Sequence, residues 1–131
     1  MISRDELQNK YSFLNPTPIT DGLMAFGFEC GDGWLPLLAK MFEDIDNVLS
    51  YQEKENFRFT QIKEKFGGLR AYYEGGNNQV SAIVDKAEQD SYNTCEQCGI
   101  NKGVKQTKGW VVSLCKKCMK KYEEKRKCKN I

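Results

Sequence analysis

The sequence contains no histidine, so it lacks the side chain that most often serves as a general acid or base near neutral pH. It also has no G-x-x-x-x-G-K-[ST] phosphate-binding loop and no serine or cysteine flanked by an evident base. We therefore predict no catalytic residue and favour a binding protein over an enzyme. Hydrolysis or group transfer at a site without a recognised motif stays open as an alternative.

Long apolar stretches are also absent. No segment approaches the roughly 18 consecutive apolar residues that a membrane span requires. The first residues, Met1 to Glu6, include no apolar stretch typical of a signal peptide. Of the 131 residues, 40% are hydrophobic, which is enough for one modest core. These features predict a cytoplasmic protein that makes no contact with a membrane and whose cysteines stay reduced.

Four cysteines occur in two C-x-x-C pairs, which we interpret as a metal site. Cys95 and Cys98 form the first pair, Cys115 and Cys118 form the second, and residues 99–114 lie between them. This spacing is typical of zinc sites, in which the two pairs of thiolates surround one ion as a tetrahedron at about 2.3 Å. Because four thiolates leave no open position on the metal, we predict a structural rather than a catalytic zinc ion.

Other uses of the four cysteines can be weighed from the sequence. Two disulfide bonds would need an oxidising compartment. An iron site of the rubredoxin type would suit Cys98-Gly99, but the second pair lacks the proline and glycine typical of such a site. The glycines between the pairs and the segment 110–114 instead predict a hairpin that returns the chain to the second pair, as in a zinc ribbon. Cys30 and Cys128 lie outside both pairs, and the sequence gives them no role.

Charge is divided unevenly along the chain. Residues 1–94 contain 9 Lys and Arg against 15 Asp and Glu, whereas residues 95–131 contain 11 against 3. A zinc ion with four thiolates adds about −2 to the C-terminal part, which leaves a net charge of roughly +6 there. This division indicates an anionic partner at the C-terminal end; a solvated basic tail beside an acidic body is the alternative. The candidate ligand-binding residues at this end are Lys116, Lys117, Lys120 and Lys121.

Hydrophobic periodicity predicts an α+β core in front of the cysteines. We expect helices at about 4–13, 33–55 and 79–93, an extended segment at 23–29 and a β-hairpin at 57–74. Ser3 would begin the first helix through a capping box, and Asp32 would be the N-cap of the long helix. The tight turn of the hairpin would use the positive φ that Gly67-Gly68 can supply. Ile62 is out of phase with the residues before it, which predicts a bulge or a sheet with both faces partly covered.

One face of the predicted hairpin combines cations with an aromatic ring. Arg70 and Tyr72 would stand across the ladder from Lys63 or Lys65. Such a set can hold a phosphate and stack a base, so we treat these four residues as a second group of candidate ligand-binding residues. A solvated sheet face with long lysine side chains is the alternative.

Three phrases of the sequence carry a resemblance to known proteins. They are Gly31-Asp32-Gly33-Trp34, the segment 61–70 (QIKEKFGGLR), and the two cysteine pairs with Gly109-Trp110 between them. In this order, over residues 28–118, the phrases resemble a group of small proteins of bacteria and their phages that share these motifs. That group often has an aromatic residue where this chain has Ala71. The resemblance implies an intracellular, often phage-associated protein with a zinc site, located in the host cytoplasm if a phage encodes it, and it implies no activity.

Together these patterns predict an α+β fold, in which a small antiparallel sheet built on the hairpin is covered by two amphipathic helices. We expect an α+β core at 1–94 and a four-cysteine zinc ribbon with a basic terminal helix at 95–131. The predicted function is that of a non-enzymatic, zinc-stabilised protein that binds an anionic partner, either nucleic acid or a nucleotide. The alternative is a phage-type inhibitor or modulator that binds a host protein through the acidic Glu43-Asp44 region or the Trp34 region.

Overall fold

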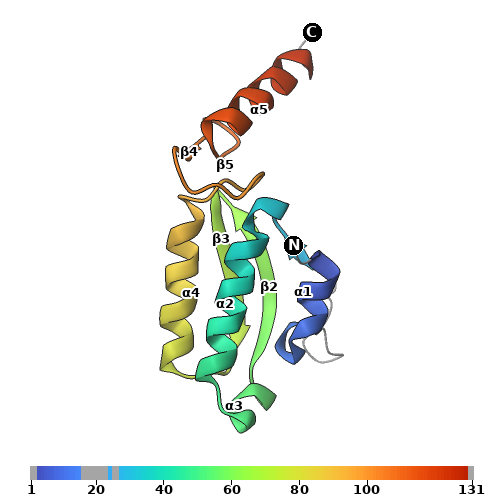
Figure 1. The fold of residues 1–131 in the computed structure, drawn as a ribbon, viewed down its shortest axis with the longest axis vertical. Helices are drawn as coiled ribbons and strands as arrows, with labels where there is room; N and C mark the ends of the chain where they lie inside the picture. The colour runs from blue at the N-terminus through green and yellow to red at the C-terminus, as the bar shows by residue number, and fades with distance from the viewer. Residues whose placement is uncertain (1–2, 16–23, 25–26, 130–131) are drawn as a thin grey trace.

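The computed structural model describes residues 3–15, 24 and 27–129, with side chains up to residue 125. It confirms the predicted α+β fold with a cysteine-rich module near the C-terminus. The elements shown in Figure 1 are α1 (Arg4–Lys10), η1 (Ser12–Leu14), β1 (Phe28–Glu29), η3 (Asp32–Trp34), α2 (Leu35–Val48), α3 (Tyr51–Glu55), β2 (Arg58–Lys65), β3 (Gly68–Glu74), α4 (Asn78–Ser91), β4 (Lys105–Gln106), β5 (Ser113–Leu114) and α5 (Lys116–Lys129).

A three-stranded sheet lies at the centre of the core, and α2 and α4 lie side by side across one of its faces (Figure 1). The strands β2 and β3 form the predicted antiparallel hairpin, and β1 pairs parallel with β2, with Phe28 opposite Ile62. The predicted extended segment 23–29 therefore contributes a short edge strand. Residues 23, 25 and 26 of that segment lie outside the described part of the chain.

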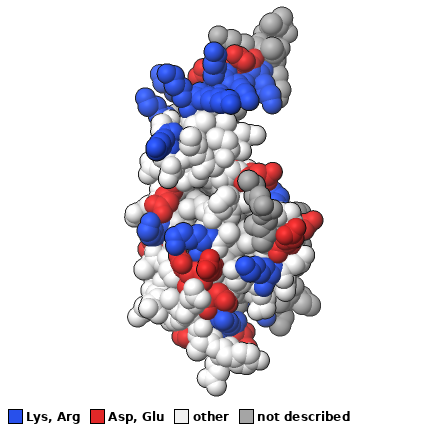
Figure 2. Space-filling view, in the orientation of Figure 1, with Lys and Arg blue, Asp and Glu red and all other residues white. Residues whose placement is uncertain are grey.

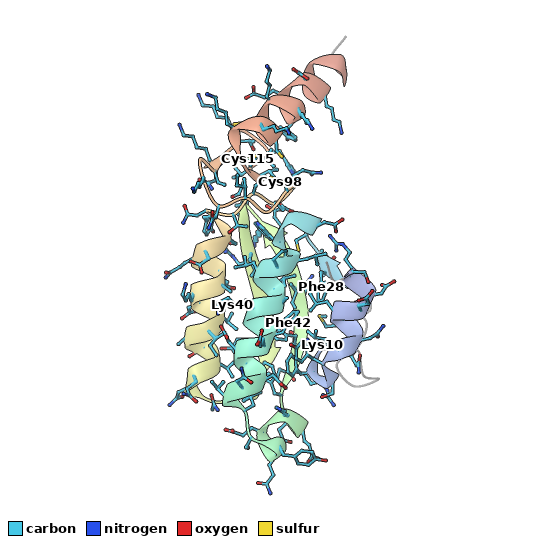
Figure 3. All side chains as sticks on the ribbon, in the orientation of Figure 1. Lys10, Phe28, Lys40, Phe42, Cys98 and Cys115 are labelled. Atoms are coloured by element: carbon cyan, nitrogen blue, oxygen red, sulfur yellow. The ribbon has the colours of Figure 1, made fainter. Side chains whose placement is uncertain are left out.

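Aromatic rings fill the space between the sheet and α2. Phe42 and Phe59 are buried, and their ring centroids lie 5.5 Å apart in an edge-to-face arrangement. The rings of Phe57 and Phe59 are 5.2 Å apart, and those of Phe28 and Phe42, labelled in Figure 3, are 5.7 Å apart. Each such pair contributes roughly 0.5–1.5 kcal/mol beyond the burial of its surface. The apolar stripes of the sequence thus meet in one aromatic core.

The N-terminal helix begins as predicted and ends early. The Glu6 N–H donates a hydrogen bond to Ser3 Oγ at 3.2 Å, which caps α1. The helix ends at Lys10 rather than near residue 13, because Tyr11 takes an extended conformation. The single 3₁₀ turn η1 that follows buries Phe13 against the aromatic core.

The prediction of one continuous helix over 33–55 is wrong. The helix α2 ends at Val48, Leu49 takes an extended conformation, and α3 begins after Ser50. A capping box causes the break, since the Glu53 N–H donates to Ser50 Oγ at 3.2 Å and the Ser50 N–H donates to the Glu53 carboxylate at 2.9 Å. The four residues from Ser50 to Glu53 carry this signal in the sequence, but the apolar stripe of α2 continues through Leu49 and obscures it.

The predicted N-cap role of Asp32 is also wrong. Asp32 opens the 3₁₀ turn η3, and α2 begins directly after Trp34 without a capping side chain. The Asp32 carboxylate instead accepts a hydrogen bond from Arg4 Nε at 2.5 Å. Arg4 also donates to the Phe28 carbonyl at 2.5 Å, so this arginine ties α1 to the segment that leads into η3.

The β-hairpin at 57–74 has the predicted bulge but a different turn. The pairing register shifts between Phe59 and Gln61, which explains the phase of Ile62. The two central residues of the turn are Phe66 (φ 53) and Gly67 (φ 85), which is the pattern of a type I′ turn, so Gly67-Gly68 are not both turn residues.

Gly68 is the first residue of β3, and a side chain there would meet a different obstacle. A Cβ at position 68 would lie 2.3 Å from the ring of Tyr92. A side chain at this position would therefore displace the ring of a residue 24 positions away in the sequence, and the turn itself does not restrict position 68.

Residues 95–125 form a second, smaller packed cluster at one end of the sheet (Figure 1). The strands β4 and β5 pair antiparallel, and α5 follows β5 almost directly. Leu114 is buried in this cluster, and Met119 and Tyr122 of α5 pack against it. The predicted division near residue 95 coincides with this change of packing, and the independence of the two parts stays a prediction. No helix in the described part of the chain is long and apolar enough to cross a membrane.

Candidate metal centre

The two cysteine pairs converge on one point. The Sγ atoms of Cys95, Cys98, Cys115 and Cys118 all lie within 4.8 Å of one another, and those of Cys98 and Cys115 are 3.7 Å apart. A tetrahedron with metal–sulfur distances of about 2.3 Å has edges of about 3.8 Å, so this separation fits thiolates that share one ion. A disulfide bond would require about 2.05 Å, and all four cysteines are free. The four cysteines can therefore hold a metal ion.

Backbone hydrogen bonds form the first knuckle. The Gly99 N–H donates to the Cys95 carbonyl at 2.8 Å, and the Cys95 N–H donates to the Ile100 carbonyl at 2.8 Å. Gly99 takes φ +86, a left-handed conformation that costs a residue with a Cβ roughly 1–2 kcal/mol. A Cβ at this position would also lie 2.9 Å from the Gly33 carbonyl oxygen. The glycine thus lets the knuckle turn and lets it approach the core.

The second knuckle uses the start of α5 in place of a glycine turn. Cys115 precedes α5, and its Sγ accepts a hydrogen bond from the Cys118 N–H at 3.4 Å, as the side chain of an N-cap residue does. The Met119 N–H donates to the Cys115 carbonyl at 2.8 Å. The start of α5 thus places Cys115 and Cys118 on one turn of the chain.

The thiols influence one another's protonation. Burial raises the pKa of Cys95, but hydrogen bonds from the backbone N–H groups of Cys115, Cys98 and Gln97 outweigh it and bring the pKa to about 7. Burial, followed by hydrogen bonds with the other three cysteines, raises the pKa of Cys118 to about 12. Metal binding requires deprotonated cysteines, and a bound cation would itself favour the thiolate form. A cation that prefers sulfur ligands fits this donor set.

The cluster is closed toward the core and open on one side. Cys95 and Cys115 are buried, Cys118 is half-buried and Cys98 is exposed. In Figure 3, Cys98 and Cys115 lie where the loops of the module meet the first turn of α5. Four sulfur ligands would complete the coordination of the metal, which leaves no position for a water molecule or a substrate.

The Gly31–Trp34 segment packs against the first knuckle. The Gly33 N–H donates to the Glu96 carbonyl at 2.8 Å, and the Gly31 N–H donates to the Glu96 carboxylate at 2.8 Å. Burial raises the pKa of this carboxyl group, and the Gly31 hydrogen bond partly opposes the rise. A Cβ on Gly33 would lie 2.3 Å from the Cys95 carbonyl oxygen, so the two backbones approach too closely for any side chain. The core thereby contacts a metal-binding loop through its backbone.

The Trp34 region was predicted as a possible contact for a protein partner, but the Trp34 side chain itself is not accessible to one. Trp34 is fully buried, and its indole N–H donates to the Thr94 carbonyl at 2.9 Å. The acidic residues of α2 are also partly neutralised. Asp44 forms an ion pair with Lys40 at 3.1 Å, and Asp46 forms one with a lysine of α3 at 2.9 Å.

The turn of the β2–β3 hairpin packs against the other half of the module. The Gly67 carbonyl accepts a hydrogen bond from Ser113 Oγ. Gln106 Nε2 donates to the same hydroxyl at 3.0 Å and to the Tyr92 carbonyl at 2.9 Å. The three phrases that carry the sequence resemblance, which are far apart in the chain, therefore meet at the junction between the core and the candidate metal centre.

The structure divides the eight predicted ligand-binding residues into two sets. Lys63, Lys65, Arg70 and Tyr72 share one face of the β2–β3 hairpin, as predicted, with Lys63 directly opposite Arg70. The Lys63 Nζ lies 5.9 Å from the centroid of the Tyr72 ring. A hydrogen bond with the Tyr92 side chain raises the pKa of Arg70, so this guanidinium already has a partner within the molecule.

The second set lies on α5 and faces two hollows. Lys117 and Lys121 line a groove of about 780 Å³, whereas Lys116 and Lys120 line a hollow of about 610 Å³. Leu114 lines both, so the two hollows adjoin the cysteine-rich module near the start of α5.

Two lysines and one tryptophan that line these hollows were not among the residues predicted from the sequence to bind a ligand. Trp110 and Lys125 line the larger groove, and Lys105 lines the smaller hollow. Lys125 could have been predicted, because it follows Lys117 and Lys121 at intervals of about one helical turn and so shares their side of the helix. No pattern in the sequence distinguishes an exposed tryptophan from a buried one.

Comparison with known proteins gives no assignment: no protein-family model, no curated protein and no solved structure matches the chain.

Proposed function

We propose that the four cysteines hold one structural zinc ion and that the module they stabilise binds nucleic acid through its lysines. The four sulfur donors, all within 4.8 Å of one another, support zinc, because structural zinc sites are commonly built from four thiolates. The predicted phage association rests on the three shared phrases alone and stays part of this proposal. The protein would act by binding, and the zinc ion would fold the binding surface rather than take part in a reaction.

The distribution of ion pairs is the observation that carries the proposal. All four ion pairs in the described part of the chain join residues of the core, namely Arg4–Asp32, Lys40–Asp44, Lys54–Asp46 and Lys86–Asp90. The lysines of the module and of α5 as far as residue 125 have no such acidic partner among the described residues. Figure 2 shows their side chains gathered over α5 and the adjoining loops, while acidic side chains are spread over the core. Such a cationic surface is typical of proteins that bind polyanions.

The spread of these lysines favours nucleic acid over a single nucleotide. The cations occupy more than one side of α5 and continue into the β4 strand at Lys105, which is more surface than one nucleotide can contact. On the hairpin face, by contrast, Arg70 bonds to Tyr92 and Lys63 lies over the ring of Tyr72, so this set already has partners within the protein.

The affinity for nucleic acid should fall steeply as salt is raised. If about four phosphates are neutralised, counterion release predicts a loss between about 50 and 200 mM salt of about 50-fold for a single strand and about 150-fold for a duplex. Substitution of Lys116, Lys117, Lys120 and Lys121 by glutamine should weaken binding similarly across sequences and should reduce the salt slope by about 3. Fluorescence anisotropy with a labelled oligonucleotide, titrated at several salt concentrations, measures both quantities.

A matched control removes the same number of charges from the core, with glutamine at Lys10, Lys40, Lys54 and Lys86. The control should bind as the wild type does. Lys40, Lys54 and Lys86 form surface ion pairs, which contribute only about 0–1 kcal/mol each, and Lys10 lies over the Tyr11 ring without an ion pair among the described residues, so the fold should persist. Equal losses of affinity in the two variants would mean that binding depends on the net charge of the protein and not on the position of the α5 lysines. The absence of binding at low salt, together with a protein ligand whose affinity tolerates moderate salt, would contradict the proposal and support the alternative of a protein partner.

A further inference from the structure

A groove beside the metal centre combines an aromatic ring with a row of cations. It has a volume of about 780 Å³ and runs between α5 and the loops of the module. This size falls within the range of about 300–1,000 Å³ that is usual for ligand sites. Its apolar lining includes Trp110, Ile100 and Val112, while one wall is formed by α5.

Trp110 is held on a closed loop with its side chain in solvent. The Thr107 N–H donates to the Val112 carbonyl at 2.9 Å, and the Val112 N–H donates to Thr107 Oγ1 at 2.9 Å. Thr107 Oγ1 also donates to the Trp110 carbonyl at 2.6 Å. These bonds fix the backbone around Trp110, yet 76% of this residue is exposed. A large aromatic side chain in this position loses little further freedom on binding and offers a flat face to a ligand.

The cations of the groove lie on one side of α5. Lys117, Lys121 and Lys125 all line it, and successive members of this row are about 6 Å apart along the helix axis. Since none of them has an acidic partner among the described residues, their charges are available to an anionic ligand. A row of this kind can follow the phosphates of an extended strand.

Two carboxylates in the same groove restrict where phosphates can lie. Glu64 accepts a hydrogen bond from the Gly67 N–H at 2.7 Å, and Glu96 accepts one from the Gly31 N–H at 2.8 Å. Both carboxylates thus bond to segments of the core, the η3 approach and the β2–β3 turn, and neither belongs to α5. Repulsion from them leaves the α5 wall for the phosphates and the Trp110 side for uncharged bases.

We infer that this groove binds single-stranded nucleic acid, with a base stacked on Trp110 and the phosphates along Lys117, Lys121 and Lys125. Stacking on an exposed ring requires a base whose face is free, which a duplex offers only at its ends. The inference rests on the proposed function, because it names the form of nucleic acid that the basic module takes.

The test compares three oligonucleotides of the same length, about 12 nucleotides. They are a thymidine strand, an abasic strand with the same number of phosphates, and a duplex. We expect the wild type to bind the thymidine strand most tightly. Trp110→Ala should lower the affinity for this strand about tenfold and leave the abasic strand unchanged, because only the stacking contribution is removed. Trp110→Phe should retain most of the affinity.

Tyr51→Ala provides a control for the loss of an exposed aromatic residue. Tyr51 is 79% exposed and lies on α3, at the end of the molecule opposite α5 (Figure 1). This variant should bind all three oligonucleotides as the wild type does. Intrinsic fluorescence gives a second readout, since Trp34 is buried and quenching by the strand should disappear in Trp110→Phe.

Equal affinity for the thymidine and abasic strands, or an unchanged affinity in Trp110→Ala, would overturn the inference. If binding then still depended on salt and on the α5 lysines, the proposed function would stand without it. If no oligonucleotide bound at low salt, both would fail. A protein ligand that needed Trp110 and tolerated salt would also overturn the inference.

Discussion

Substitution of Cys95 or Cys115 by serine is expected to release the metal and unfold the module around it. A serine hydroxyl is a poor substitute for a thiolate, and structural zinc contributes on the order of 10 kcal/mol of apparent free energy that is also folding free energy. Both cysteines are buried in the module's packed cluster, so bonds from them to a metal would hold its few apolar residues together. Zinc content and the midpoint of thermal unfolding should both fall sharply.

The remaining cysteines serve as controls for this prediction. Cys30 packs against the core and lies outside the group of four Sγ atoms that can share one ion, so it is not expected to bind the metal. Cys30→Ser and Cys128→Ser should keep the zinc content of the wild type. Zinc retained at wild-type level in both Cys95→Ser and Cys115→Ser would show that the metal, if present, is bound elsewhere.

Gly33→Ala is expected to lower both the stability of the core and the retention of the metal. The added Cβ would lie 2.3 Å from the Cys95 carbonyl oxygen and 2.6 Å from the Glu96 carbonyl oxygen. Both are backbone atoms of the first knuckle, which cannot rotate away as a side chain can. Separation of the two backbones would also break the Gly33–Glu96 hydrogen bond. We expect a loss of about 3 kcal/mol in the free energy of unfolding, measured by denaturant titration, and faster removal of zinc by a chelator.

Gly103→Ala is the matched control for this substitution. A Cβ at Gly103 would meet nothing within 4 Å, so its only cost is the positive φ of 64, about 1 kcal/mol. Zinc retention should not change in this variant. If Gly33→Ala were as stable as Gly103→Ala and kept its zinc equally well, the first knuckle would not be held by the core.

Much of the fold could be predicted from local patterns in the sequence. The alternation around the hairpin, the apolar stripes of α2 and α4 and the cap at Ser3 each depend on neighbours a few residues away. The candidate metal centre was also predictable, because the spacing within and between the cysteine pairs determines which thiols can share one ion. These predictions agree with the structure because each feature is determined by residues that are close together in the sequence.

Features that depend on distant contacts could not be predicted in this way. A side chain at position 68 would displace the Tyr92 ring, and a side chain at position 33 would meet the backbone at Cys95 and Glu96. The sequence shows these glycines but not the atoms that exclude a side chain. The burial of Trp34 and the exposure of Trp110 likewise arise from tertiary packing, and the two indoles differ in no local pattern.

The metal content of the purified chain tests the central claim most directly. Native mass spectrometry combined with elemental analysis should find one zinc ion per chain. The thiols of Cys95, Cys98, Cys115 and Cys118 should react with an alkylating reagent only after a chelator removes the metal. A chain that contained no metal and was lighter by the four hydrogens of two disulfide bonds would contradict the account, as would a stoichiometric iron ion in place of zinc.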